Sequence, residues 1–213
     1  MIRLSLYGAI AGPISQLWYV QDYWHPIYTL GRFGIVEDML FAAFVAGISG
    51  GVINLLLGVR SVESKELGNS WMRIVVAIAL IIGALFLMTN VLKIDSIYAS
   101  AISFVLLSGL ILYQRPDLWK ASLVGMIFWL CAIIPAYNVI LLIWPRFIED
   151  WWLWSNISGI TLLNIPLEEY LWFGTWGLVG SIIYEWKGGY RFIPDGAKEP
   201  SVQNHGEQVD YTV

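Results

Sequence analysis

The sequence predicts an all-α membrane protein, a polytopic bundle of about six transmembrane helices, from three observations. The chain of 213 residues is 58% hydrophobic and only 13% charged, whereas a soluble domain is about one quarter charged. Long uncharged runs recur from one end of the chain to the other. Two related acidic motifs stand at the heads of two of the predicted helices.

Each predicted helix corresponds to a run that can cross a bilayer. Five runs without Asp, Glu, Lys or Arg are 4–21, 39–59, 74–92, 96–114 and 121–145. Each is about 18 residues or longer, enough to span a hydrocarbon core of ~30 Å at 1.5 Å per residue. A sixth run, 166–186, carries Glu168 and Glu169 near its start. We expect the first run to be a retained helix, bent near Gly12 and Pro13, because further membrane helices follow it.

The charges in the loops predict the orientation of the bundle. With six crossings, nine of the twelve basic residues share one side with both termini: Arg3, Arg60, Lys65, Arg73, Arg115, Lys120, Lys187, Arg191 and Lys198. The other side has Arg32, Lys93 and Arg146. The positive-inside rule then predicts an integral multi-pass cell membrane protein with both termini in the cytoplasm. Residues 1–187 would form the embedded bundle, and the polar segment 188–213 a disordered cytoplasmic tail.

Composition also limits the partners and cofactors. Cys131 is the only cysteine, so no intramolecular disulfide can form. The two histidines, His25 and His205, fall in a predicted loop and in the tail, which leaves no plausible zinc or haem site. No basic cluster suggests nucleic acid, and no glycine-rich fingerprint suggests a nucleotide cofactor. We therefore expect no cofactor or metal, with the lipid bilayer as a partner; a homo-oligomer stays an open alternative.

Aromatic residues gather on the predicted extracytoplasmic side. They fall in Trp18–Trp24, after the first helix, and in Trp144–Trp154, after the fifth. Tryptophan and tyrosine are typical of a belt at the lipid headgroups, and the second stretch could form a short interfacial helix. Asp22, Glu149 and Asp150 within these stretches are expected to be solvated loop charges.

An acidic motif occurs twice. The two stretches are FGIVEDMLFAAF (33–44) and NIPLEEYLWFGT (164–175). Aligned without gaps, Glu37 and Asp38 match Glu168 and Glu169. Four crossings separate the two helices, so both acid pairs are expected at the extracytoplasmic end. If the helices meet, four carboxylates converge there.

Two explanations of these acids stay open. Carboxylates in a first turn favour the helix dipole, and a proline such as Pro166 suits a helix start. Ionisable groups near membrane depth are, however, functional candidates. A carboxyl kept protonated by desolvation can protonate an alkene, aromatic faces can stabilise the resulting cation, and a second carboxylate can remove a proton. Four neighbouring aromatics could line that path: Phe41, Trp172, Phe173 and Trp176.

The stretch IPLEEYLWF resembles the Pro-x-Glu-Glu/Asp motif of the small membrane lycopene cyclases, the heterodimeric bacterial, fused archaeal and fungal type. The resemblance implies ring closure of an acyclic carotenoid end without net redox change. It also implies that Glu168 and Glu169 are the second catalytic acid pair, and that Glu37 and Asp38 are the first. The first motif departs from the pattern, because Ile35 stands where the family has proline.

We therefore predict a membrane isoprenoid or carotenoid cyclase, an isomerase similar to the lycopene beta-cyclases. Two alternatives remain at this point. One is a transporter or channel in which the acids form a cation or proton site. The other is a structural subunit that pairs with a separate cyclase. The sequence leaves open the isoprenoid, the ring type, and which carboxylate is acid and which is base.

Overall fold

The computed structural model describes residues 1–28, 34–64 and 67–197, and these residues are mostly helical. Phe33 of the first motif, Lys65 and the segment 198–213 lie outside the described residues. Four helical spans are long and apolar enough to cross a membrane: Ile35–Leu57, Trp71–Val91, Ser96–Gln114 and Pro116–Ile143. The all-α class is therefore confirmed. A count of six crossings, which needs the first and last predicted helices as well, stays a prediction.

Helices α1 (Ile2–Asp22) and α2 (Ile35–Leu57) pack closely through small residues. A Cβ atom at Gly8 would collide with the backbone oxygen of Ala42, and one at Gly12 with that of Asp38. Such small faces let helix backbones approach each other where lipid gives no hydrophobic drive between helices. Close packing of α1 on α2 therefore sets the position of the first acidic motif.

The middle of the chain forms three helices. Helix α3 (Trp71–Phe86) continues into a π-helical turn, η1 (Leu87–Val91), and α4 (Ser96–Gln114) follows. A 3₁₀ turn, η2 (Pro116–Leu118), leads into α5 (Trp119–Ile143).

Asp22 determines where α4 begins. Its carboxylate accepts a hydrogen bond from the Ser96 backbone N–H at 2.9 Å and another from the Ser96 hydroxyl. A side-chain oxygen on a free N–H at a helix start replaces a missing intrahelical bond. The expectation that Asp22 is a solvated loop charge is therefore wrong, because it joins the end of α1 to the start of α4. Burial and the nearby Asp22 carboxylate also raise the pKa of Asp95.

The second motif follows a compact turn. Helix α6 (Phe147–Trp151) confirms the short helix expected after the fifth span. A hairpin of β2 (Thr161–Leu162) and β3 (Ile165–Pro166) then leads directly into α7 (Leu167–Gly180). Helix α7 packs between α4 and α5, and α8 (Ile183–Gly188) follows it. The sixth predicted run is thus two helices, interrupted at Ser181 and Ile182.

A small sheet joins distant segments at one end of the bundle. Strand β1 (Val59–Glu63) pairs antiparallel with β4 (Tyr190–Pro194), with Ser61 opposite Phe192. The first residues of the segment expected to be a disordered tail thus form a paired strand. The pairing brings the end of α2 to the end of α8.

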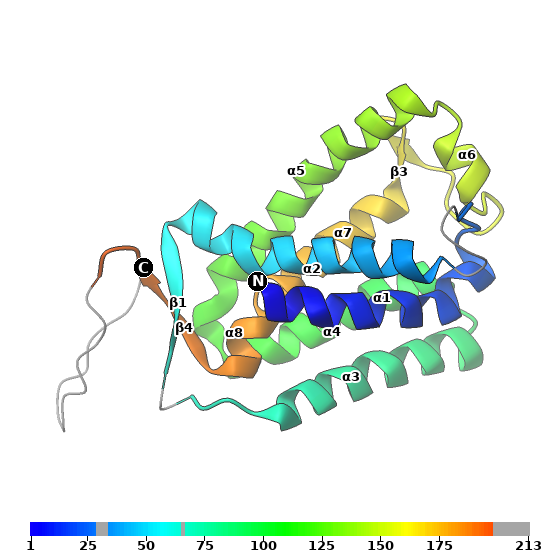
Figure 1. Ribbon diagram of the computed structural model, residues 1–213. Coiled ribbons are helices and arrows are strands. Elements are labelled where there is room, and N and C mark those ends of the chain that lie inside the picture. The colour runs from blue at the N-terminus through cyan, green and yellow to red at the C-terminus, as the bar shows by residue number, and fades with distance from the viewer. Residues whose placement is uncertain (29–33, 65–66, 198–213) are drawn as a thin grey trace, which may run out of the picture.

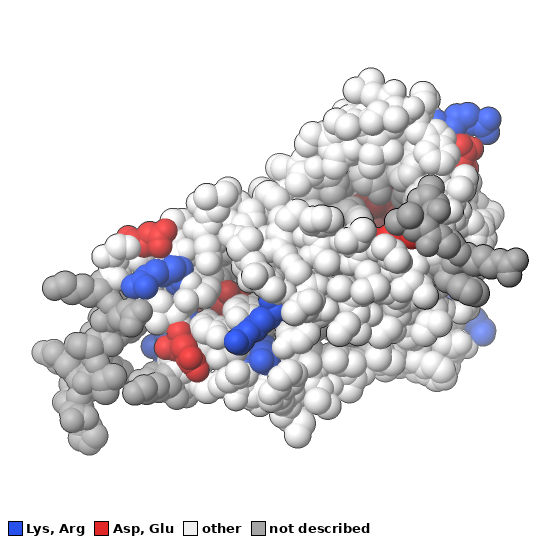
Figure 2. All heavy atoms as spheres, viewed as in Figure 1, with Lys and Arg blue, Asp and Glu red and all other residues white. Residues whose placement is uncertain are grey.

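Long helices that follow one another along the chain run in opposite directions (Figure 1). Helices α1, α3 and α5 run from the end with the β1–β4 sheet towards the end with α6, and α2, α4 and α7 run back. Charged side chains gather towards these two ends, and the surface between them is almost uncharged (Figure 2). An uncharged band between charged ends is the surface expected of a protein that spans a bilayer.

Candidate functional site

Glu169 lies in a cage of aromatic hydrogen-bond donors. One carboxylate oxygen, Oε1, accepts hydrogen bonds from the Tyr23 hydroxyl and, at 3.1 Å, from the Trp152 indole N–H. The other, Oε2, accepts one from the Tyr137 hydroxyl. The donors come from the end of α1, from the residue after α6, and from α5, and Glu169 is only 6% exposed. Hydrogen bonds from these three donors favour the ionised form of the carboxylate, whereas its burial favours the neutral form.

Glu168 is even more buried, at 1% exposure, but its two oxygens differ. Oε1 accepts hydrogen bonds from the Tyr98 hydroxyl at 2.7 Å and from the Ser158 backbone N–H at 2.8 Å. Oε2 has no hydrogen-bond partner within the described part of the chain. A buried carboxyl oxygen without a partner is costly for a structural role alone.

A cavity of about 300 Å³ adjoins Glu168. Its other lining residues are Tyr98, Ser158, Leu167 and Leu171. The two leucines are partly exposed at the outer surface of α7. The cavity thus brings Glu168, whose Oε2 has no partner among the described residues, to an apolar space beside two exposed leucines of α7.

Tyrosines outside the helices remain neutral donors. Burial, followed by the charge of Glu169, raises the pKa of Tyr23 well above its usual range. Burial, followed by Asp38, raises the pKa of Tyr28 to about 12. Both phenols therefore keep their protons at physiological pH and can go on donating to the carboxylates.

The first motif has its own donors. Asp38 is buried and accepts hydrogen bonds from the Gln16 amide at 3.2 Å and the Tyr28 hydroxyl at 3.4 Å. Gln16 in turn accepts one from the Trp24 indole at 2.9 Å. Glu37, its neighbour on α2, is half-buried.

Trp24 and Trp152 connect the two motifs. Their rings meet edge-on with centroids 5.9 Å apart. One network thus runs from Asp38 through Gln16 and Trp24, and the other starts at Glu169 and Trp152. The two motifs are held by separate sets of donors that touch through this ring pair. Direct convergence of four carboxylates stays a prediction.

The structure brings the four predicted aromatics together. Phe41 on α2 lies 6.5 Å from Trp172 and 6.4 Å from Phe173, measured between ring centroids. Trp172 stacks on Trp176 at 6.1 Å with an interplanar angle of 12°. Phe104 from α4 meets both tryptophans edge-on. These side chains form one aromatic wall across α2, α4 and α7.

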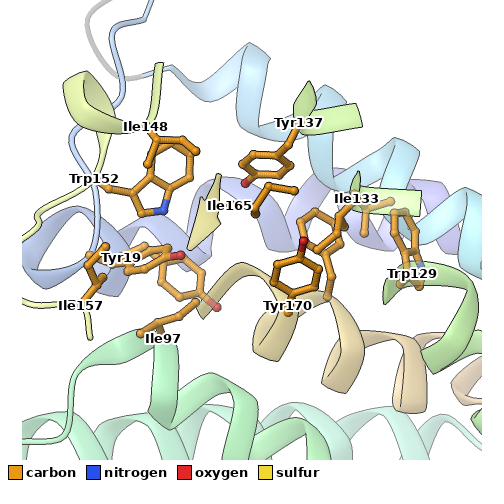
Figure 3. Close-up of a cluster of buried hydrophobic side chains, with 13 residues drawn as sticks. Tyr19, Ile97, Trp129, Ile133, Tyr137, Ile148, Trp152, Ile157, Ile165 and Tyr170 are labelled. Atoms are coloured by element: carbon orange, nitrogen blue, oxygen red, sulfur yellow. The ribbon is translucent and has the colours of Figure 1, made fainter. Parts of the chain in front are cut away.

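Sequence reasoning missed the residues that hold the second acid pair. Tyr23 and Trp152 belong to the two stretches interpreted as an interfacial belt, yet each is only 4% exposed. The belt interpretation is therefore wrong for these two, which point inward. Trp152 and Tyr137 lie near Ile165, at the entrance to α7 (Figure 3). The sequence did hold a signal for these donors, because the Tyr- and Trp-rich loops and the acid pairs were predicted on the same side of the membrane.

The fold and site define a helical protein of membrane type with a buried carboxylate pair at one end. A lycopene cyclase family model matches residues 95–187, from the start of α4 to α8. The match supports membership of the lycopene cyclase family, and thereby a carotenoid cyclase role in general. It covers Tyr98, Glu168 and Glu169 and does not extend to the first motif. No curated protein and no solved structure matches the chain.

Proposed function

We propose that the protein closes rings on lycopene-like acyclic carotenoid ends by acid–base chemistry without net redox change, as a lycopene beta-cyclase-like isomerase. The observation that carries this proposal is the unlike environment of two neighbouring buried acids. Glu169 has both oxygens hydrogen-bonded, whereas Oε2 of Glu168 has no partner within the described segments, and Glu168 borders an apolar cavity. Unlike environments let one of two neighbouring carboxyls donate a proton while the other acts as a fixed charge.

In this mechanism Glu168 moves the proton. In its neutral form, its Oε2–H protonates the terminal double bond of the substrate, and the cation formed is attacked by an internal double bond to close the ring. Loss of a proton from the carbon next to the cyclic cation leaves a new ring double bond. The Glu168 carboxylate left by the first step is placed to accept that proton. One proton is gained and one is lost, so the product is an isomer of the substrate.

Glu169 and the aromatic wall stabilise the cation. In this proposal Glu169 is ionised, a form that its three donors favour, and it is the neighbour of the reacting acid on α7. The faces of Phe41, Trp172 and Phe173 offer π-electron density to a positive carbon without offering a nucleophile. The donors around Asp38 suggest a parallel, second acidic site in the first motif.

The arrangement in the bilayer is part of the proposal. Helices α1 and α7 cross along with the four longer spans, which places both termini in the cytoplasm and both acid pairs at the extracytoplasmic end. The two motif-bearing helices are then related repeats. Leu167 and Leu171 border the cavity at the surface of α7, so a carotenoid can reach Glu168 sideways from the lipid.

Expression in a lycopene-accumulating host, followed by pigment chromatography, tests the proposal. We expect new monocyclic or bicyclic products from the wild type and none from Glu168→Gln. Glu149→Gln is the matched control, because Glu149 is exposed and pairs with Arg146 of the same segment at 3.4 Å. Unchanged products from Glu168→Gln would overturn the site. No product from well-expressed wild type would favour a transporter or a partner subunit.

A further inference from the structure

A second cavity, of about 370 Å³, lies at the opposite end of the bundle from the acid pairs. It is bordered by the start of α1, the end of α2, β1 and α8. The polar residues that line it are Arg3, Asn54, Ser61, Tyr184 and Glu185. The proposed cyclase chemistry uses none of them.

Glu185 is a buried acid whose two carboxylate oxygens have different surroundings. It is 2% exposed, and its Oε1 accepts a hydrogen bond from the Ser61 hydroxyl at 2.9 Å. Its Oε2 has no hydrogen-bond partner among the described residues. Burying such an oxygen without a donor is costly, so the site is incomplete without one.

Two protein cations influence Glu185, and neither donates a hydrogen bond to its Oε2. The Met1 α-ammonium and Arg115 act on Glu185 electrostatically. Arg115 directs its guanidinium at Asp117, at 2.6 and 2.7 Å, and at the Tyr190 carbonyl, at 3.0 Å. When Glu185 is ionised these cations partly balance its charge, while its buried Oε2 has no donor among the described residues.

Arg3 supplies the opposite charge on the same cavity. Its side chain is exposed, and it forms no ion pair with another described residue. Its electrostatic neighbour is the Tyr184 phenol. A guanidinium of this kind matches a phosphate, which it can bind through two parallel hydrogen bonds. The cavity therefore offers an anion site at Arg3 and a cation site at Glu185.

The cavity also lies next to surface suited to acyl chains. Ile2 on α1 lines the cavity, and Leu55 on α2 follows the lining residue Asn54. Both are large apolar side chains exposed at the surface. Charged atoms of both signs gather at this end of the molecule, beyond the uncharged band (Figure 2). A ligand here would have its polar group among charges and its apolar part along the helices, as a phospholipid has.

We propose that this cavity binds the headgroup of a phospholipid that carries a primary ammonium. The lipid phosphate lies on Arg3, and the ammonium donates to Oε2 of Glu185 with Asn54 beside it. A primary ammonium fits because it donates hydrogen bonds, whereas a quaternary ammonium has no N–H to give. The site is independent of the cyclase chemistry.

Native mass spectrometry of the purified full chain tests the proposal. The protein in detergent is offered equal amounts of phosphatidylethanolamine and phosphatidylcholine with identical acyl chains. We expect the first lipid to be bound about tenfold more, since one hydrogen bond to a charged group contributes on that scale. Equal binding of the two lipids by the wild type would overturn the proposal.

Three variants separate the two halves of the site. Glu185→Gln should bring the ratio of the two lipids close to one. Arg3→Gln, at an exposed position that does not threaten the fold, should weaken both lipids and keep their ratio. Glu63→Gln is the control, because it removes the same charge from an exposed residue of β1 and should change neither. An unchanged ratio in folded Glu185→Gln, or unchanged binding in Arg3→Gln, would contradict the assignment.

Two further additions distinguish other ligands. Phosphatidylglycerol has the phosphate without the ammonium, so the wild type should bind it less than phosphatidylethanolamine; equal binding would show a site for phosphate alone. Free O-phosphoethanolamine in excess should displace the lipid only weakly, because it lacks acyl chains. Complete displacement at equal concentration would show a site for a soluble headgroup and overturn the lipid.

Discussion

Glu168 and Glu169 differ by one position on a helix, and this difference turns them to unlike surroundings. Successive residues of a helix point about 100° apart. Glu168 therefore faces Tyr98 on α4, while Glu169 faces Tyr137 on α5 and Trp152. Because α7 packs between α4 and α5, each acid is supported by a different neighbour. A doubled acid at this place is thus two sites, one on each face of α7.

The Tyr137→Phe substitution tests whether the hydrogen bond from the Tyr137 hydroxyl stabilises Glu169 in its buried position. The change removes one donor and leaves the buried Oε2 of Glu169 unpaired. We expect a loss of about 1–3 kcal/mol in the free energy of unfolding and a clear decrease in cyclised product. Thermal unfolding and pigment chromatography measure the two effects. Tyr113→Phe is the control, because Tyr113 is 87% exposed; equal stability of the two variants would refute the role given to Tyr137.

At the scale of the helices, the close packing of α5 against α7 depends on glycines. A Cβ atom at Gly177 would lie 2.5 Å from the Gly125 carbonyl oxygen, whereas one at Gly109 would meet nothing within 4 Å. We expect Gly177→Ala to destabilise the protein by about 1–3 kcal/mol through overpacking, and to lower product because α7 carries the acids. Gly109→Ala should be neutral or slightly stabilising, since alanine favours a helix over glycine. Unfolding midpoints of the two variants in one detergent decide this; a Gly177→Ala midpoint at or above that of Gly109→Ala would contradict it.

The helices were predictable from the sequence because their signal is local. The uncharged run 96–114 coincides with α4, and the run 39–59 overlaps α2. The β1–β4 pair was missed because its partners are far apart in sequence and neither strand has a strong pattern of its own. Strand pairing between such segments is a tertiary contact.

The candidate site was predictable only in part, where its residues are close together in the sequence. The acids were visible as charges in an apolar helix, and the aromatic wall followed from their neighbours on α2 and α7. The donors Tyr23, Tyr137 and Trp152 were not visible as such, because they reach Glu169 from three other segments. The direction of a loop tryptophan, outward to headgroups or inward to a carboxylate, is decided by packing and not by its neighbours in sequence.

At the scale of the whole molecule, polar structure is confined to two ends. At one end, Asp22, the aromatic loops and α6 close over the acid pair. At the other, Arg73 donates hydrogen bonds to the carbonyls of Leu67, Gly68 and Trp186 and joins the start of α3 to α8. The bundle between is apolar on its outside, so we expect its ends on opposite sides of the bilayer, and the Lys and Arg distribution predicts which end is cytoplasmic.

Cysteine labelling tests that orientation. In a Cys131→Ser background, Glu149→Cys marks the α6 end and Glu63→Cys marks the sheet end, both at exposed positions. We expect a membrane-impermeant thiol reagent to label Glu149→Cys in intact cells, and Glu63→Cys only after permeabilisation. Three of the four longest apolar spans lie between the two positions, so they should fall on opposite sides whatever α1 and α7 do. Labelling of both in intact cells would contradict these crossings, and the reverse pattern would invert the orientation.

A third position decides whether α1 crosses. If α1 and α2 both span the bilayer, the start of the chain lies on the same side as β1, and Arg3→Cys should be protected in intact cells as Glu63→Cys is. If α1 instead lies along the surface, Arg3 shares the side of the α6 end, and Arg3→Cys should be labelled with Glu149→Cys. The close packing of Gly8 and Gly12 on α2 favours the first result, because a helix packed along a spanning helix shares its depth. Protection of Arg3→Cys would thus support five crossings before α6, with the start of the chain on the side opposite the acid pairs.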